Sequence, residues 1–383
     1  MKFPKISFGD EWNNLKKFEN LSDFERSIVF YAENKASMNH FRTLIFELTE
    51  RMNFQICYIT SVKNDPIFSS KNKNILSFYI GEGASRTKFF LTLRAKILVM
   101  DMPDLDTYHI KRSKAYPVHY IYLFHSMFSI HSYLRKEALD NYDTIFCVGP
   151  HHVNEIKATE KLYELKPKKI INYGFGRLDT LLQEKEKFEK SDSNLKDLIL
   201  ITPSYGSENL LEKCGIELID TLLKSNFRVL LRPHFRTLRD SKELIDSIKD
   251  KFGKNPNFTF EDGVIPSEYF HNSICMVSDW SGISMEYAFT FERPIIFIDV
   301  PKKVLNPNSS DILLEPIEIS LRSKLGYIVS PNSLKIIPDL IKDTNKNNKF
   351  SQQIRKMRSE TVFNIGESAK IGADFIQQLI KSN

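Results

Sequence analysis

The residues best suited to chemistry stand where apolar, strand-like runs of this chain end. His125 follows the run 118–124, and His234 follows the run 227–231 after an arginine and a proline. An imidazole titrates near neutral pH, so at a strand end it can take a proton from a hydroxyl group or donate a hydrogen bond to a phosphate. We therefore predict that His125 is a general base and that His234 is a hydrogen-bond donor. The competing interpretation gives both residues structural roles in turns.

The stretch 278–288 predicts a binding site for phosphate. The apolar run 274–277 ends there, and a helical pattern begins near Gly282. The first N–H groups of a helix are unpaired, and the helix dipole favours an anion beside them. The candidate donor-binding residues of the stretch, with a glutamate placed to bind a ribose, are Ser278, Asp279, Ser281, Gly282, Ser284 and Glu286. Alternatively, serine and aspartate before a helix are ordinary N-caps.

Three arginines and another serine complete the predicted phosphate site. Arg232 and Arg236 flank His234, and two neighbouring positive charges favour the neutral form of its imidazole. Arg177 also follows an apolar run, and each arginine could form paired hydrogen bonds with phosphate oxygens. Ser204 lies in a turn after another strand-like run. Each arginine is equally compatible with a surface ion pair.

The elements that position these residues alternate along the chain. Strand-like runs and helical patterns follow one another on both sides of a polar, aperiodic stretch at 189–194, which we interpret as a linker. Such alternation favours parallel sheets covered by helices. The predicted strands are 54–61, 75–80, 96–100, 118–124, 143–148 and 169–173 before the linker, and 198–202, 227–231, 258–260, 274–277 and 294–300 after it.

We predict an α/β protein with two Rossmann-like domains that face a central cleft, the arrangement called GT-B. The acceptor-side domain covers residues 1–188, and the donor-binding domain covers residues 195–350. The final segment, 351–383, contains one long helical pattern and is expected to pack back on the first domain. Near the N-terminus, the segments 22–30 and 39–51 are predicted as helices, the first behind a capping box.

Composition limits the partners and the location. The chain has 383 residues, 42% of them hydrophobic, and a formal net charge of +6, which is too small an excess to indicate nucleic acid. The four cysteines lack metal-type spacing and are expected as reduced thiols in the cytoplasm. No apolar run of about 18 residues predicts a membrane span. The face with Trp12, Leu15 and Phe18 either packs on the protein, which we favour, or makes peripheral contact with the inner face of the plasma membrane.

No cluster of residues requires a cofactor or a metal. His151 and His152 are adjacent, but they lack the nearby Cys, Asp or Glu ligands that a metal site needs. Arginines and a helix terminus can neutralise phosphates unaided. Mg²⁺ is therefore compatible with the predicted site without being implied by it.

Four short motifs within residues 96–301 resemble, in the same order, those of the CDP-glycerol glycerophosphotransferases, which are polymerases and primases of teichoic acid and some capsules. Ser278-Asp-Trp-Ser-Gly-Ile-Ser-Met-Glu-Tyr-Ala288 is similar to the family's Ser-Asp-Tyr-Ser-Ser-x-x-x-Asp-Tyr-Ala. Arg232-Pro-His234 matches Arg-Pro-His, and Gly174-Phe-Gly-Arg-Leu-Asp179 is similar to Gly-x-Pro-Arg-x-Asp. Leu123-Phe-His-Ser126 stands where the family has Trp-His-Gly. The shared order makes the resemblance specific.

The resemblance implies a transferase that moves a glycerophosphate-like unit from a CDP-activated donor to a growing surface polysaccharide of the capsule, teichoic acid or O-antigen type. Its expected partners are CDP-glycerol, CDP-ribitol or a nucleotide sugar as donor, and a glycan or lipid-linked glycan as acceptor. The chain departs from the family at Gly176, where proline is usual, at Glu286, where aspartate is usual, and after His125, where a lysine is missing. Because of these departures, the resemblance defines the identity of the donor better than that of the acceptor.

Three other functions remain open. The same fold and histidines would serve a GT-B glycosyltransferase, in which the acceptor attacks a sugar carbon, or a hydrolysing epimerase of nucleotide sugars. A nucleotide-binding scaffold without activity is the alternative from another class. The nucleotide that is released distinguishes the transferases, because CMP follows attack on phosphorus and a nucleoside diphosphate follows attack on a sugar.

Overall fold

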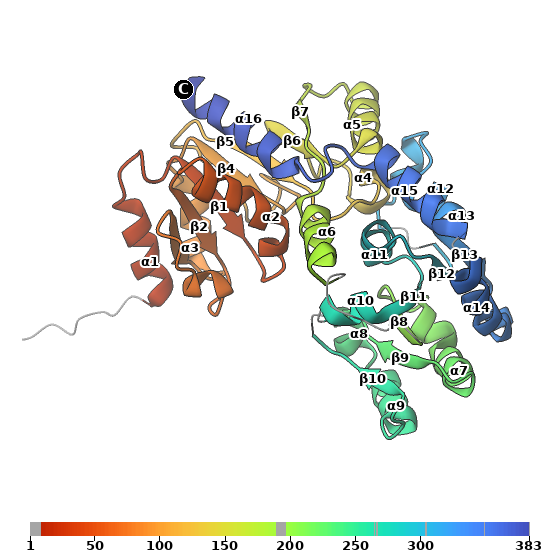
Figure 1. The fold of residues 1–383 in the computed structure, drawn as a ribbon. Coiled ribbons are helices and arrows are strands. Elements are labelled where there is room, and N and C mark those ends of the chain that lie inside the picture. The colour runs from red at the N-terminus through yellow and green to blue at the C-terminus, as the bar shows by residue number, and fades with distance from the viewer. Residues whose placement is uncertain are drawn as a thin grey trace, which may run out of the picture. The chain divides into compact units, whose positions relative to one another are not determined.

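The computed structural model describes residues 9–188, 197–263, 265, 267–302, 305–347 and 349–382. The linker predicted at 189–194 lies outside them. The chain forms two compact units, each built on one parallel sheet (Figure 1). Unit 1 comprises Met1–Asp179, Asn306–Ile312 and Val362–Asn383, and unit 2 comprises Thr180–Leu305 and Leu313–Thr361. Unit 1 therefore takes in two segments that come late in the chain.

The sheet of unit 1 has the order β3-β2-β1-β4-β5-β6-β7 among the described residues. Its strands are β1 (Ile28–Ala32), β2 (Ile56–Thr60), β3 (Ile75–Tyr79), β4 (Ile97–Met100), β5 (His119–Leu123), β6 (Thr144–Cys147) and β7 (Lys169–Asn172). All neighbours pair in parallel. The strand order reverses between β1 and β4, and ligands of such sheets bind outside the carboxyl ends of the strands at that point.

Strand β1 replaces the helix predicted for residues 22–30. The predicted capping-box hydrogen bonds do form, since the Ser22 N–H donates to Glu25 Oε2 at 2.8 Å and the Glu25 N–H donates to Ser22 Oγ at 3.3 Å. They surround a single turn, and the chain then enters a fully buried strand that pairs with both β2 and β4. The helix prediction was wrong because a β-branched and aromatic run buried on both faces outweighs a local cap.

The helices of unit 1 cover its sheet (Figure 1). They are α1 (Asp10–Glu19), α2 (Ser37–Phe46), which continues as the π-helix η1 (Glu47–Arg51), η2 (Pro66–Ser69), α3 (Ala84–Thr92), α4 (Ile130–Tyr133), α5 (Pro150–Leu162), the start of α6 (Gly176–Phe188), η3 (Ser309–Asp311) and α16 (Ser368–Ser382). Leu15 and Phe18 of α1 are buried, and the Phe18 ring packs against Phe78 and Phe89. The favoured packing of this face is confirmed, so these two side chains are not available to a membrane.

The C-terminal segment forms two helices where one was predicted. Helix α15 (Lys349–Thr361) belongs to unit 2, and α16 belongs to unit 1. Between them Asn364 and Gly366 have φ angles of 45° and 83°, which no α-helix accommodates. Helix α16 packs on α2, and its Phe375 ring lies 5.9 Å from the Phe146 ring of β6.

Unit 2 repeats the architecture with the sheet order β10-β9-β8-β11-β12-β13, again wholly parallel. Its strands are β8 (Leu198–Thr202), β9 (Arg228–Leu231), β10 (Phe258–Phe260), β11 (Ser273–Ser278), β12 (Ile295–Ile298) and β13 (Gly326–Val329), the last not predicted. Its helices are α7 (Leu210–Lys224), α8 (Phe235–Asp240), α9 (Lys242–Phe252), α10 (Ser267–Asn272), α11 (Ile283–Phe291), α12 (Ile317–Ser320), α13 (Arg322–Leu325), η4 (Pro331–Ile336), α14 (Ile337–Asn347) and α15. Here the strand order reverses between β8 and β11. None of the helices in the described ranges is both long and apolar enough to span a membrane.

Candidate active site

His125 lies just past β5, at the carboxyl edge of the unit 1 sheet. Its Nδ1 is 3.0 Å from the backbone carbonyl oxygen of Asp101. A carbonyl only accepts, so Nδ1 carries the proton and Nε2 keeps its lone pair. Burial lowers the pKa of His125, and this hydrogen bond opposes the shift in part. A neutral imidazole with an unprotonated Nε2 has the form that a general base requires.

A pocket of about 390 Å³ opens beside His125, where the strand order of unit 1 reverses. The residues that line it follow β1, β4 and β5 or belong to α2. They are Glu33, Asn34, Ala36, His40, Asp101, Met102, Pro103, Asp104, Tyr108, His109, Ile110 and His125. The predicted base therefore borders a space that can receive a small ligand.

Helix α5 holds the loop that follows His125. His151 and His152 lie within 2.9 Å, through Nε2, of backbone carbonyls in this loop. The Glu155 carboxylate accepts the Ile130 N–H at 2.5 Å. The adjacent histidines therefore fix the backbone beside the candidate base. Within the described ranges, no group of three or more His, Cys, Asp and Glu side chains is placed to hold a metal ion.

Asp101 and His40 line the pocket but were not singled out from the sequence. The Asp101 carboxyl is 6% exposed and accepts the Ser37 hydroxyl at 3.1 Å, and burial raises its pKa to about 7. The His40 ring lies 6.1 Å from the His125 ring. Burial holds the pKa of His40 well below its ordinary value, assisted by the charges of His125 and Arg177. An aspartate directly after an apolar run could have indicated Asp101, whereas His40 lies inside a helix without a motif.

The glycine-rich motif before α6 serves close packing within unit 1. Gly174 has a φ of 104°, and a Cβ there would lie 2.3 Å from the Phe363 carbonyl oxygen. Asp179 accepts the Gly366 N–H at 2.7 Å and the Ser368 N–H at 3.3 Å, so it caps α16. Arg177 is half-buried in the first turn of α6, and its positive charge helps to lower the pKa of His40.

Asp279 organises the candidate donor site of unit 2. Its side chain is 2% exposed, and its Oδ1 accepts the N–H groups of Ser204 and Trp280, each at 2.7 Å. Its Oδ2 accepts the Leu210 N–H at 2.9 Å. Burial raises the pKa of Asp279, and these hydrogen bonds lower it. The carboxylate thus ties the turn after β8 and the start of α7 to the end of β11.

Two of the predicted serines also support the backbone. Ser278 donates to the Thr202 carbonyl at 2.7 Å, and Ser284 donates to the Ser281 carbonyl at 2.8 Å. Helix α11 begins after Gly282, as predicted, and no side chain caps it. Ser281 and Gly282 are half-buried at this helix end. The hydroxyl groups of Ser278 and Ser284 are therefore occupied, and the backbone N–H groups at the start of α11 are better placed to bind an anion.

His234 follows β9, the other neighbour of β8 in the sheet. Its Nδ1 accepts the Arg236 N–H at 3.2 Å, which places the ring proton on Nε2. The His234 ring makes tilted contacts with the Tyr205 and Phe235 rings, at 4.6 and 4.5 Å, and the Arg236 guanidinium lies 4.6 Å over Tyr205. His234 therefore has the opposite tautomer to His125 and can donate through Nε2.

Arg232 brings a positive charge to the same edge. Its Nε donates to the Gly263 carbonyl at 3.3 Å. Burial lowers the pKa of Arg232, and the charges of Glu261 and Glu286 raise it. Arg232 and Glu286 thus interact although they follow different strands. Of the predicted residues, His125 and Arg177 belong to unit 1, and all the others belong to unit 2.

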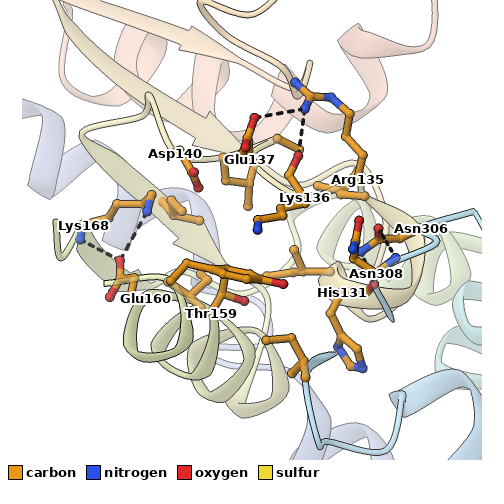
Figure 2. A pocket seen from close by; sticks show the side chains of 18 residues that line it. His131, Arg135, Lys136, Glu137, Asp140, Thr159, Glu160, Lys168, Asn306 and Asn308 are labelled. Atoms are coloured by element: carbon orange, nitrogen blue, oxygen red, sulfur yellow. Dashed lines mark hydrogen bonds and ion pairs between the residues drawn. The ribbon is translucent and has the colours of Figure 1, made fainter. Parts of the chain in front are cut away.

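A second pocket in unit 1, of about 50 Å³, lies beside the segment 306–312 (Figure 2). Lys136 Nζ is 3.7 Å from the centre of the Tyr163 ring. Lys168 Nζ is 3.5 Å from Glu160 Oε1, and the Asn306 amide donates to a backbone carbonyl of α4 at 2.8 Å. Because these polar groups are engaged and the space is small, we interpret this pocket as the place where the returning segment docks.

Comparison with known proteins gave a match to one family. The family model described as CDP-Glycerol:Poly(glycerophosphate) glycerophosphotransferase matches residues 17–303. No curated protein sequence matches the chain. The structure of the wall teichoic acid polymerase TagF is similar with a TM-score of 0.59 and 14% identity, over 97% of this chain and 94% of that chain.

Solved structures of UDP-GlcNAc 2-epimerases are similar to the same degree. The enzyme from Neisseria meningitidis bound to UDP-GlcNAc has a TM-score of 0.58 and 14% identity, over 92% of this chain and 99% of that chain. The enzyme from Methanocaldococcus jannaschii has a TM-score of 0.57 and 15% identity, over 92% and 99% of the two chains. At these identities the likeness concerns the fold, and it confirms the predicted α/β architecture of two Rossmann-like sheets.

Proposed function

Because the chain belongs to the CDP-glycerol:poly(glycerophosphate) glycerophosphotransferase family, and is a transferase of that family, we propose that it moves glycerol phosphate from CDP-glycerol to a hydroxyl group of a surface glycan. The observation that carries the proposal is the fixed tautomer of His125, which presents an unprotonated Nε2 at a pocket of suitable size. A TagF variant soaked with CDPG is among the similar structures, which supports this choice of donor.

The reaction needs one proton transfer and one displacement at phosphorus. The acceptor hydroxyl oxygen attacks the β-phosphorus of the donor and forms a new phosphodiester. The bond from that phosphorus to the bridging oxygen breaks, and CMP leaves with the electron pair. His125 Nε2 takes the hydroxyl proton during the attack, a step that typically contributes about 10²–10⁴-fold in rate. Little further covalent chemistry is required, so positioning and charge neutralisation supply the rest.

The edge of unit 2 supplies the donor site in this proposal. The uncapped N–H groups of α11 and the guanidinium groups of Arg232 and Arg236 suit a pyrophosphate. His234 donates through Nε2 to a phosphate oxygen and supports the leaving group. Glu286 accepts hydrogen bonds from the ribose. Asp279, with the buried serines, keeps this backbone in place.

The donor is tested with a panel of CDP-glycerol, CDP-ribitol, UDP-sugars and GDP-sugars, incubated with the purified chain and a glycan acceptor. Released nucleotides are separated by anion-exchange chromatography. The proposal expects CMP, at the highest rate from CDP-glycerol, and an unchanged rate after treatment with EDTA. If UDP or GDP is released from a nucleotide sugar and no CMP is released from a CDP donor, the proposal is wrong and the chain transfers sugars.

A further inference from the structure

Glu33 stands directly after β1, at the point where the strand order of unit 1 reverses. In this sheet Tyr31 pairs with Met100, and Met100 pairs with Tyr122. Glu33, two residues past Tyr31, is therefore level with the chain just before His125, two strand spacings or about 10 Å away across the sheet. Both side chains line the same pocket of about 390 Å³. A small ligand in this pocket can therefore contact both of them.

One carboxylate oxygen of Glu33 is held, and the other is accessible. Oε1 accepts a hydrogen bond from Arg86 at 3.3 Å. The side chain is 32% exposed, and Oε2 is neither buried nor hydrogen-bonded to any residue that the structure describes. Burial raises the pKa of Glu33, and the charges of Arg86 and His109 lower it. The carboxylate is thus held through one oxygen and can accept a hydrogen bond from a ligand through the other.

The lining of the pocket favours hydroxyl groups over phosphate groups. It contains the carboxyl groups of Glu33, Asp101 and Asp104, and no lysine or arginine among the described residues. A phosphodiester would meet like charge there, so an acceptor that carries phosphates enters by its hydroxyl end and keeps its phosphodiester outside. Asp101 is only 6% exposed, and Asp104 lies beyond the strand end and pairs with Arg135 at 2.5 Å. Glu33 is therefore the accessible carboxylate at a strand end.

The end of a poly(glycerophosphate) chain carries the groups that these two side chains require. A terminal glycerol unit that is linked through one primary oxygen keeps a free primary hydroxyl group and a neighbouring secondary hydroxyl group. It is uncharged and small enough for the pocket. His125 Nε2 can accept the proton of one hydroxyl group, and Glu33 Oε2 can accept a hydrogen bond from the other. A hydrogen bond to a charged acceptor is about twice as strong as one between neutral groups.

We propose that Glu33 is a specificity-determining residue for the acceptor, whose Oε2 accepts a hydrogen bond from the secondary hydroxyl group of a terminal glycerol unit while the primary hydroxyl group meets His125. The inference rests on the proposed function, because His125 deprotonates that primary hydroxyl group. It deepens the function by naming the residue that distinguishes a glycerol end from an end with a single hydroxyl group. Contact with both hydroxyl groups also orients the attacking oxygen.

Two acceptors of equal charge isolate the secondary hydroxyl group. Glycerol 3-phosphate and 3-hydroxypropyl phosphate each offer one primary hydroxyl group, and only the first has a secondary one. Both are tested with the full chain and CDP-glycerol, and CMP release is measured. We expect kcat/KM to be about 10–100-fold higher for glycerol 3-phosphate, the effect of one hydrogen bond to a charged group. Equal values for the two acceptors in the wild type would overturn the proposal.

Substitutions at Glu33 should change the ratio of these two kcat/KM values. Glu33→Ala should reduce the ratio to about one, and Glu33→Gln should keep part of it, because an amide oxygen still accepts a weaker hydrogen bond. A folding defect lowers both rates alike, so the ratio reports the contact and not the amount of native protein. A ratio that is unchanged in Glu33→Ala would overturn the role of Glu33.

Glu82→Gln is the matched control. Glu82 is exposed and its negative charge acts on Glu33, but it does not line the pocket. The substitution therefore removes a nearby charge without removing the hydrogen-bond acceptor, and the ratio should stay at the wild-type value. Equal effects of Glu82→Gln and Glu33→Gln would show that charge alone sets the preference and would contradict the assigned contact.

Failure of this inference and failure of the proposed function give different results. If CMP is released equally with both acceptors, the role of Glu33 fails while the function stands. If no acceptor yields CMP, the function fails, and saturation-transfer NMR with the same two phosphates tests Glu33 by binding. Weaker binding of glycerol 3-phosphate alone in Glu33→Ala then supports the contact, and unchanged binding contradicts it. If methyl glycosides of neutral hexoses are preferred to glycerol 3-phosphate, the glycerol assignment is wrong.

Discussion

His125 and His234 carry their ring protons on different nitrogens. Nδ1 of His125 donates to the carbonyl of Asp101, whereas Nδ1 of His234 accepts an N–H from Arg236. One imidazole can therefore act as a base and the other as a hydrogen-bond donor. The residue types and strand-end positions were predictable from sequence. The hydrogen-bond partner of His125 was not predictable, because Asp101 follows another strand and lies 24 residues away in the chain.

Replacement of His125 by asparagine tests the base. Asparagine keeps a polar group of similar size but cannot take the proton, so kcat should fall about 10²–10⁴-fold. The KM for CDP-glycerol should change little, since the donor is assigned to unit 2. His119→Asn is the matched control, because His119 begins β5, the strand that precedes His125, and contacts Thr144 at 2.8 Å. Full activity of His125→Asn with an active control would remove the base from the mechanism.

The pH dependence of turnover follows from the same residue. Burial lowers the pKa of His125 below its ordinary value of about 6.5, so the neutral base is present throughout the range above that value. We expect kcat/KM to be level between about pH 7 and pH 8 and to fall only below about pH 6.5, as protonation removes the base. An acid limb centred above pH 7 would show that another group controls the rate.

At the scale of elements, the ends of β8, β9 and β11 build the candidate donor site. Sequence placed these ends and the start of α11 correctly, because apolar runs and turn residues are local signals. From the sequence, Ser278, Asp279 and Ser284 were predicted to bind the donor. In the structure, their side chains form hydrogen bonds with backbone groups. The N–H groups that Asp279 accepts include two about 70 residues earlier in the chain, which no local pattern reveals.

Asp279→Asn should weaken this frame. An amide offers one acceptor oxygen where the carboxylate offers two, and its NH₂ group would oppose a backbone N–H. We expect a loss of about 2 kcal/mol in the free energy of unfolding, measured with urea, and a higher KM for CDP-glycerol. The control is Asp197→Asn in the same unit, an exposed partner of Arg228 at 2.6 Å, which should cost no more than about 1 kcal/mol. Equal losses in the two variants would contradict the role of Asp279.

Across the whole molecule, sequence predicted two parallel sheets and missed how the segments are shared between the units. The alternation of strands and helices predicts the architecture, because parallel strands need long crossover connections, which are usually helical. It does not reveal that 306–312 returns to unit 1 or that the last helix breaks before residue 368. The sequence analysis also missed β1, because its apolar residues follow the capping box at Ser22 and were therefore predicted as a helix. Such features depend on tertiary contacts that local propensity does not contain.

The acid stability of the molecule should reflect its buried histidines. Burial lowers the pKa values of His40, His125, His151 and His152 in the folded state. Near pH 6 the unfolded chain therefore binds protons that the folded chain does not, so stability falls as pH falls, by up to about 1.4 kcal/mol per pH unit for each group. Asp101, whose pKa is raised to about 7, acts in the opposite direction. Other carboxyl groups with raised pKa values oppose the histidines as well, namely those of Glu33, Asp104, Asp140, Asp179 and Asp279.

Histidines of the unfolded chain, with an ordinary pKa of about 6.5, take up most of their protons between pH 7 and pH 5.5, so we expect the urea midpoint to be lower at pH 5.5 than at pH 7. Asp101→Asn removes one opposing group and should make the decrease steeper. A midpoint that stays constant or rises at pH 5.5 would show that these histidines are not buried in the neutral form.

The most direct test of the account follows the phosphorus atoms of CDP-glycerol by ³¹P NMR during turnover with a neutral glycan acceptor. We predict that CMP and a new phosphodiester on the acceptor appear in a one-to-one ratio, and that both signals are lost in His125→Asn. Formation of CDP, or of CMP with free glycerol phosphate and no phosphodiester on the acceptor, would contradict glycerol phosphate transfer.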